Sequence, residues 1–297
     1  MTHQKSGRSK QRPYVLWSVI LGSAVLFATV ARAQVPACDA LTGEARARAD
    51  RLLGALFAHD CCDESLAACL KAPAPARLVK RLAAEVCRLV AQGLHEAEVK
   101  RAVEKRAASM PPVAKAQAIE ETDLAWAGEA QAPVKVVVFA CARCPFCSKA
   151  VPALYQAVTE GALKGRARLG VKLFPVRTHP FAAEAATAVE AARALGRFWP
   201  FVLELYRRFD DFAVERLPDV AVAADVDRAA FTAEVAKPAT RERVVATKKE
   251  GVRLGVEATP TIFLDGRLYR GDVTDQDGLL DAVAEEAERL GGGLCGR

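Results

Sequence analysis

Two cysteines carry the clearest chemical signal in this sequence. Cys144 and Cys147 form a C-x-x-C pair directly after a β-branched run, which predicts a buried strand followed at once by a helix. Cys144 is then expected at the N-cap, where backbone N–H groups and the positive helix end would lower its thiol pKa. Cys147 lies one turn later on the same face and can close a disulfide with Cys144. The pair predicts thiol–disulfide exchange, with Cys144 as nucleophile and Cys147 as resolving thiol.

Three residues around the pair are expected to modulate it. Pro145 suits the first position of the helix, because that position needs no N–H donor. Arg143 adds a positive charge beside the nucleophile, and a neighbouring cation lowers the pKa of a thiol. Phe146 completes the dipeptide between the two cysteines.

Cys141 stands three residues before the nucleophile, at the end of the predicted strand. Three alternatives remain open for its thiol. It can stay inert in the core, form a disulfide with a remote cysteine such as Cys295, or compete with Cys147 for Cys144.

The resulting C-x-x-C-x-x-C run superficially suits a metal. An iron–sulfur cluster needs a fourth cysteine, however, and none follows at a suitable spacing. The histidines after the first 33 residues, His59, His95 and His179, are scattered, so each is expected at the surface or at a helix cap rather than on zinc. We therefore expect neither a metal nor a cofactor.

The elements that must position these residues are predicted from hydrophobic patterning and turn signals. In chain order they are a strand over Val134–Ala140, a helix over Cys144–Glu160, a strand over Arg168–Val176, a helical block over residues 181–255, two short strands over Thr261–Leu264 and Arg267–Tyr269 joined by an Asp265-Gly266 turn, and a helix over Asp275–Leu290. This order predicts an α/β fold with helices inserted between the second and third strands.

Residues 36–109 form a separate predicted region, which is helical. Helices are expected near Ala45–Phe57, Ala76–Val90 and Glu96–Ala107, with Gly93 as a C-cap. So small a core usually needs covalent support, and we predict a helical bundle stapled by two disulfides.

Five cysteines lie in this region, and the sequence leaves their pairing open. They are Cys38, Cys61, Cys62, Cys69 and Cys87, and Cys295 lies near the C-terminus. Adjacent Cys61 and Cys62 are expected to reach different partners. The odd total of nine cysteines leaves at least one thiol free or bonded outside the chain.

The first 33 residues are typical of a secretory signal peptide. A basic segment precedes the uncharged run Tyr14–Val30, and Ala31-Arg32-Ala33 fits an A-x-A cleavage site. We expect cleavage and a periplasmic or secreted protein; the alternative is a retained N-terminal membrane anchor, since 17 residues is the lower limit of a spanning helix. Removal of the segment lowers the formal net charge from +6 to +1, so nucleic acid is not an expected partner.

The expected organisation follows from these segments and from the helix-breaking Met110-Pro111-Pro112. It comprises a signal peptide over 1–33, a disulfide-stapled helical domain over 36–109, a linker over 110–125, a catalytic domain over 126–291 and a tail over 292–297. A chain that starts near Val113 is expected to fold alone.

From about Trp126 to Leu290 the sequence resembles the DsbA-like branch of the thioredoxin superfamily. The likeness rests on Gly128–Val134, Phe139–Cys147, Pro152, Phe174–Pro180, Arg197–Trp199 and Ala258–Phe263, which occur in the family's order. It implies a thioredoxin fold with a helical insertion. It also implies that Pro260 is a cis-proline packed against the active cysteines, with Thr259 before it pairing with the substrate chain.

The sequence departs from the family at two positions. Members often carry a buried acid six residues before the first cysteine, where this chain has Val138, and an aspartate three residues before it, where this chain has Cys141. Another group or water must then accept the proton of Cys147. The Pro-Phe dipeptide lacks the histidine of the strongest oxidants, which implies an intermediate redox poise.

The expected function is an enzyme, an exported thiol:disulfide oxidoreductase that acts on cysteines of exported polypeptides together with an unidentified redox partner. The general direction is oxidation, which fits an oxidising compartment. One alternative is an isomerase or reductase kept reduced by a membrane partner. Another is a binding or chaperone module whose thiols are incidental.

Overall fold

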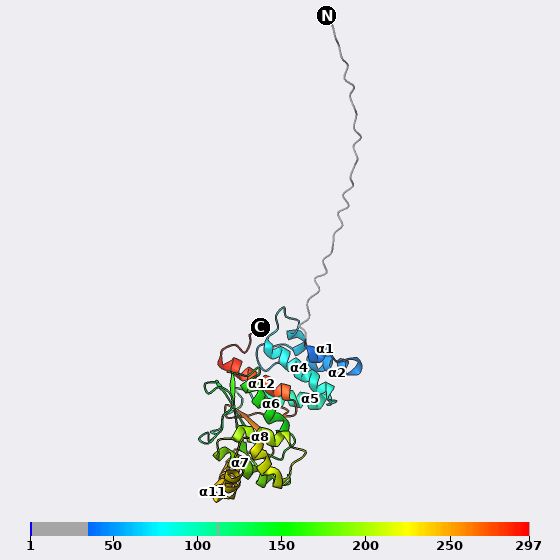
Figure 1. Ribbon diagram of the computed structural model, residues 1–297. Coiled ribbons are helices and arrows are strands. Elements are labelled where there is room, and N and C mark those ends of the chain that lie inside the picture. Colours follow the sequence, from blue (N-terminus) through cyan, green and yellow to red (C-terminus); the bar gives the residue numbers. More distant parts are fainter. Residues whose placement is uncertain (2–34, 112, 297) are drawn as a thin grey trace. The chain divides into compact units, whose positions relative to one another are not determined.

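The computed structural model describes residues 35–111 and 113–296, together with Met1 (Figure 1). Apart from Met1, the predicted signal peptide over 1–33 lies outside these residues. No helix in the described part of the chain combines the length and the apolar character needed to cross a bilayer.

A four-stranded sheet organises the second half of the chain. Its strands are β1 (Val134–Ala140), β2 (Ala167–Leu173), β3 (Thr261–Leu264) and β4 (Arg267–Leu268), in the spatial order β2-β1-β3-β4. β1 pairs in parallel with β2 and antiparallel with β3. The predicted strands are present, but β2 ends at Leu173, before Pro175, which has no N–H group to continue a ladder.

Helices cover both faces of this sheet. α6 (Cys147–Thr159) and α12 (Gln276–Leu290) pack on the face that carries Val136 and Val138. On the other face Phe139 and Phe263 meet edge to face at 5.8 Å between ring centroids. Gly251 lets the helix on this face come close, because a Cβ at Gly251 would lie 2.7 Å from a ring carbon of Phe174.

The helical block predicted over residues 181–255 is an insertion between β2 and β3. Its α-helices are α7 (Ala182–Ala194), α8 (Phe198–Arg207), α9 (Leu217–Ala223), α10 (Arg228–Ala236) and α11 (Pro238–Arg253). α7 contacts each of the other four, and Phe201 of α8 stacks on Phe231 of α10 at 5.4 Å. The chain therefore has a thioredoxin-type sheet with the predicted helical insertion.

The β3–β4 hairpin turns at Asp265-Gly266, as predicted. Both residues have positive φ, 46° and 78°, which is the geometry of a type I′ turn. Glycine is needed at 266 for a second reason, because a Cβ there would lie 2.4 Å from the Gln117 carbonyl oxygen.

The N-terminal region is a helical bundle with its own core. Its helices are α1 (Pro36–Asp39), α2 (Gly43–Ala55), α3 (Leu66–Cys69), α4 (Arg77–Ala91) and α5 (Glu96–Ala107). α4 is central and contacts the other four, and its Leu78, Leu82 and Val86, which recur at spacing four, are fully buried. Gly93 follows α4 with φ of 89°, as expected of a glycine that ends a helix.

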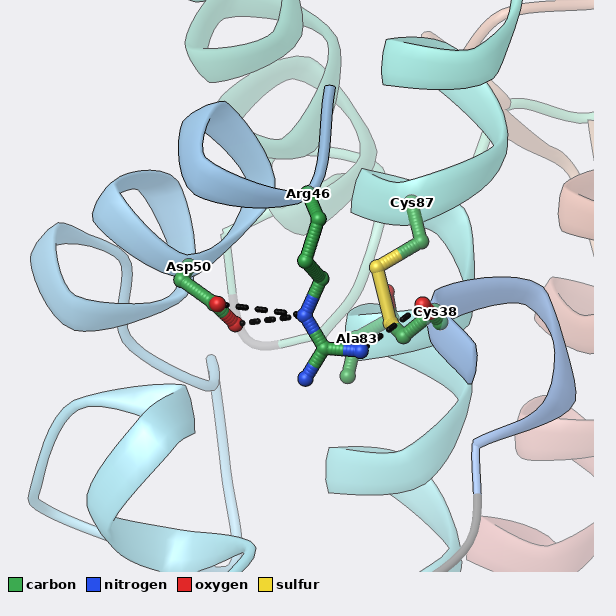
Figure 2. Close-up of a disulfide and its surroundings, with 5 residues drawn as sticks. All are labelled: Cys38, Arg46, Asp50, Ala83 and Cys87. Carbon is green, nitrogen blue, oxygen red and sulfur yellow. Dashed lines mark hydrogen bonds and ion pairs between the residues drawn. A yellow bond between two sulfur atoms is a disulfide. The ribbon is translucent and has the colours of Figure 1, made fainter. Parts of the chain in front are cut away.

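Two disulfides lie inside this bundle, as predicted. Cys38 of α1 is bonded to Cys87 of α4 (Figure 2). Cys62 is bonded to Cys69. Arg46 of α2 donates to the Cys38 carbonyl oxygen at 3.0 Å and, through Nε, to the Asp50 carboxylate at 3.1 Å. The bridge and this arginine together tie three segments of the bundle to one another.

A third disulfide joins Cys61 to Cys295. Adjacent Cys61 and Cys62 thus reach different partners, as predicted. The segment expected to be a C-terminal tail is instead fixed to the helical region, since the Arg77 amide also donates to the Gly296 carbonyl oxygen at 3.1 Å.

Charged side chains also join the helical region to the sheet region. Arg106 of α5 has no exposed surface and forms ion pairs with Glu85 of α4 and Glu285 of α12. Arg88 of α4 adds a bidentate pair with Asp275, at 2.9 and 3.0 Å. Figure 1 shows α4 beside α12, where these pairs form. The helical region was expected to be separable from the sheet region, yet the two share these buried ion pairs.

Candidate active site

The Cys144–Cys147 pair lies where β1 passes into α6. α6 begins at Cys147 with Phe146 as its N-cap, three residues later than predicted, and the Lys149 N–H donates to the Phe146 carbonyl oxygen at 3.3 Å rather than to that of Pro145. Cys144 nevertheless keeps the features of an N-cap. Its carbonyl oxygen accepts the Ser148 N–H at 3.0 Å, and its sulfur faces the N–H groups of Phe146 and Cys147.

These donors make Cys144 an acidic thiol. The neighbouring Cys147 thiol, then Thr259 and the backbone N–H groups of Cys147 and Phe146, lower the pKa of Cys144 to about 5 against the opposing effect of burial. The Cys144 Sγ also lies 3.1 Å from the Thr259 carbonyl oxygen. A thiol with this pKa is a thiolate at neutral pH, the form that attacks disulfides.

Cys147 has the opposite character. It is completely buried, and burial together with the neighbouring Cys144 raises its pKa well above that of an ordinary thiol. Val138, at the position where the resemblance leads one to expect an acid, is also fully buried, in the core cluster that contains Cys147. The pair therefore consists of one acidic thiol and one thiol that stays protonated.

The loop before β3 closes the site from the other side. The Thr259–Pro260 peptide bond is cis, as the resemblance implies, and Pro260 is buried. The Thr259 carbonyl oxygen lies against Cys144, 115 residues away in sequence. Thr259 and the two cysteines are thus brought together as predicted.

Arg143 takes a different orientation from the one expected. Its guanidinium lies over the rings of Phe212 and Phe209, at 4.1 and 4.6 Å from their centroids, and donates to the Phe209 carbonyl oxygen at 2.9 Å. Phe212 in turn packs on Phe181. The side chain is held by this aromatic cluster, so its expected effect on the thiolate remains a proposal for experiment.

Cys141 is a free, buried thiol that contacts His179, which was expected at the surface or at a helix cap, and Tyr206, about which the sequence predicted nothing. The alternative of a bridge to Cys295 is wrong, because Cys295 is bonded to Cys61. His179 Nδ1 lies 3.3 Å from the Cys141 Sγ, and the Tyr206 hydroxyl donates to the Cys141 carbonyl oxygen at 3.3 Å.

One signal was available for His179. It follows β2, which runs parallel to β1, and the carboxyl ends of parallel strands meet at one edge of a sheet. His179 is half-buried and contacts the Cys141 thiol, whereas a place at the surface or at a helix cap was expected. His95, by contrast, is a helix cap as predicted, and its amide donates to Glu98 at 2.8 Å. Tyr206 comes from the inserted helix α8, and no local signal pointed to it.

A group of side chains has ligand atoms close enough together to hold a metal ion. Between residues 35 and 296, leaving out residue 112, the single group of ligating side chains close enough to share an ion is Asp60, Cys61 and Cys295. Two of these three are joined in a disulfide. The group lies outside the active-site turn and offers no support to the exchange chemistry.

A family model described as thioredoxin matches residues 120–283, more than half of the chain. The crystal structure of oxidised BdbD from Bacillus subtilis is similar over 59% of this chain and 98% of that one, with a TM-score of 0.51 and 19% sequence identity. That likeness shows the fold.

Curated relatives match only a part of their own length. The chain is 33% identical over 153 residues to a protein named Na(+)/H(+) antiporter NhaA 1 from Mycolicibacterium gilvum, a match covering 48% of this chain and 24% of that protein. It is 35% identical over 111 residues to an NhaA protein of Herminiimonas arsenicoxydans, covering 37% and 18% respectively. The chain therefore spans about a quarter or less of these relatives.

Proposed function

Because the chain belongs to the thioredoxin family, we propose that it is a DsbA-like thiol:disulfide oxidoreductase that exchanges disulfides with cysteines of exported polypeptides through Cys144 and Cys147. The single observation that carries this proposal is the position of the Cys144 sulfur between β1 and α6, 3.1 Å from the Thr259 carbonyl oxygen, with the fully buried Cys147 three residues later. Cys144 has a pKa of about 5, whereas the pKa of Cys147 is raised well above its ordinary value.

The chemistry then proceeds through a mixed disulfide. In the oxidising direction a substrate thiolate attacks Cys144 Sγ, the Cys144–Cys147 bond breaks and Cys147 leaves with the electron pair. A second substrate thiolate attacks the substrate sulfur of the mixed disulfide and releases Cys144 as thiolate. The substrate is oxidised by two electrons and the cysteine pair is reduced.

Stabilisation of the Cys144 thiolate favours this direction. Donors that hold the thiolate stabilise the reduced chain relative to the disulfide, which makes the pair an oxidant. Because the intervening dipeptide is Pro-Phe, we expect an intermediate reduction potential, between about −270 mV for a reducing thioredoxin and about −120 mV for the strongest oxidants.

The surface around Cys144 suits an extended peptide. Phe146 is 51% exposed and Phe181 is 56% exposed, although large apolar side chains are usually buried. The backbone at Thr259 lies beside the nucleophile, where a substrate chain can pair with it as an added strand. We propose these groups as the substrate-binding surface.

Export is part of the proposal. The predicted signal peptide and the six disulfide-bonded cysteines both suit an oxidising compartment, and we propose a periplasmic or secreted protein. A soluble or membrane redox partner would restore the active disulfide. The antiport activity in the names of the curated relatives is not carried over, because the match covers about a quarter of those proteins or less.

Oxidation of a reduced two-cysteine peptide by the oxidised chain tests the function. We expect rapid peptide oxidation by the unaltered chain and none by Cys144→Ser. The matched control removes the Cys62–Cys69 disulfide by Cys62→Ala with Cys69→Ala, and it should retain the rate because that bridge belongs to the helical region.

Two results would contradict the proposal. If the Cys144→Ser chain still oxidises the peptide, Cys144 is not the nucleophile. Suppression of aggregation of unfolded proteins by the Cys144→Ser chain, without any exchange activity in the unaltered chain, would favour a chaperone module with incidental thiols.

A further inference from the structure

Cys141 and Cys144 lie at the two ends of one turn. The Cys144 N–H donates to the Cys141 carbonyl oxygen at 3.0 Å, which closes a four-residue turn. The end residues of such a turn have Cα atoms less than about 7 Å apart, and disulfides span Cα distances of about 4.4–6.8 Å. The same turn therefore holds two overlapping C-x-x-C pairs that share Cys144.

The Cys141 thiol also has a base in contact with it. His179 Nδ1 lies 3.3 Å from the Cys141 Sγ, although 38 residues separate them in sequence. Burial raises the pKa of Cys141, so the thiol is protonated at neutral pH and needs an acceptor before it can attack. A cysteine next to an imidazole is the arrangement that activates a thiol in nucleophilic catalysis.

Tyr206 contacts the same turn. Its buried hydroxyl donates to the Cys141 carbonyl oxygen at 3.3 Å. Cys141, Cys144 and Cys147 are all buried in the core cluster that also contains Tyr206. The other six cysteines of the chain are bonded in pairs, which leaves Cys141 as the one thiol without an assigned role.

We propose that Cys141 is a second resolving thiol, activated by His179, that can release a substrate from Cys144 in place of Cys147. The inference rests on the proposed function of Cys144 as nucleophile. In the mixed disulfide, His179 Nδ1 takes the Cys141 proton and the Cys141 thiolate attacks Cys144 Sγ. The Cys141–Cys144 bond forms, the bond from Cys144 to the substrate sulfur breaks, and the substrate thiolate leaves with the electron pair and is protonated. Cys141 and Cys144 are thereby oxidised, and the substrate sulfur is reduced.

The Cys147→Ser chain isolates this route. The full chain carrying Cys147→Ser is treated with oxidised glutathione, separated from free glutathione and followed by mass spectrometry. We expect the Cys144–glutathione adduct to decay unaided into a chain with a Cys141–Cys144 disulfide, which peptide mapping identifies. With Cys141→Ala added, the adduct should persist at least about 10-fold longer.

A third variant tests the base. His179→Asn keeps a hydrogen-bonding group near the position of Nδ1 but cannot accept the thiol proton at neutral pH. In the Cys147→Ser background it should lengthen the adduct lifetime by about 10-fold, toward that of the chain lacking Cys141. Addition of free imidazole should shorten the lifetime again if the missing function is proton transfer.

Different results would overturn the role of Cys141 and the proposed function of Cys144. Equal adduct lifetimes with and without Cys141, and no Cys141–Cys144 disulfide in the map, would overturn the role of Cys141. If Cys141→Ala does not fold, the disulfide map of Cys147→Ser alone decides. Absence of any Cys144 adduct when both Cys141 and Cys147 are removed would overturn the proposed function instead.

Discussion

The helical region and the active-site turn use the same residue type for opposite purposes. Six cysteines are bonded in pairs, five of them from the helical region and the sixth, Cys295, from the C-terminal end. The three cysteines at the active-site turn are free. Cys87 lies fully buried inside the bundle, whereas Cys144 has N–H and S–H donors directed at its sulfur. The surroundings of the sulfur therefore decide whether a cysteine forms a structural disulfide or acts as a nucleophile.

Loss of the buried ion pairs between the helical region and the sheet region should produce the largest effect on stability. Arg106→Met removes the buried cation that pairs with Glu85 and Glu285, and it leaves two buried carboxylates without a partner. We expect a loss of about 3–5 kcal/mol in the free energy of unfolding. Urea denaturation followed by circular dichroism measures it.

The control is Arg51→Met, which breaks an exposed ion pair with Glu96. It should cost less than about 1 kcal/mol. If the two variants lose similar stability, the buried pairs do not hold the regions together.

Removal of a disulfide from the helical region should reduce the free energy of unfolding slightly less and leave the thiol–disulfide exchange unchanged. Cys38→Ala with Cys87→Ala opens a bridge between residues 49 apart in sequence. We expect a loss of about 2–4 kcal/mol in the free energy of unfolding and an unchanged rate of peptide oxidation. A large loss of rate in the folded variant would mean that the helical region takes part in exchange, and the contrast between the two regions would fail.

The pH dependence of alkylation should distinguish Cys144 from an ordinary thiol. Because the pKa of Cys144 is about 5 rather than 9.0, its reactive thiolate fraction at pH 7 should be about 100-fold that of an ordinary thiol. The alkylation rate of Cys144 in the reduced chain should therefore rise with a midpoint near pH 5 and level off by about pH 6 to 7.

The same shift fixes the sign of a stability effect. The folded pKa lies below the unfolded one, so the unfolded chain binds more protons between about pH 5 and 9, and the stability of the reduced form should rise with pH across this window. This contribution is lost as the pH falls through 5. A midpoint near pH 9 in the alkylation profile would contradict both statements.

Arg143 should give the smallest effect. Its guanidinium is stacked on Phe212 and Phe209, so Arg143→Met should shift the pKa of Cys144 by less than about half a unit. Thiolate absorbance in the ultraviolet, titrated in both chains, measures the shift. A rise of a full unit would restore the role that the sequence assigned to this charge.

Much of the fold followed from the sequence, because the deciding signals are local. The β-branched run over Val134–Ala140 predicted β1 with its bounds, and the positive-φ preference of Asp265-Gly266 predicted the hairpin. A bond between Cys141 and Cys295 was one of the alternatives, and it was wrong. Cys295 is bonded instead to Cys61, 234 residues away, and that pairing depends on where the C-terminal segment contacts the helical region.

The nucleophilic pair could be identified from the sequence alone, since Cys144 and Cys147 lie within one turn and their chemistry depends on the strand and helix that flank them. The groups that surround the pair depend on tertiary packing. His179 reaches Cys141 from the end of a neighbouring strand, Tyr206 from an inserted helix, and the Thr259 carbonyl oxygen reaches Cys144 across 115 residues. Contacts of this kind form when separate elements pack into one core, and no local pattern records them.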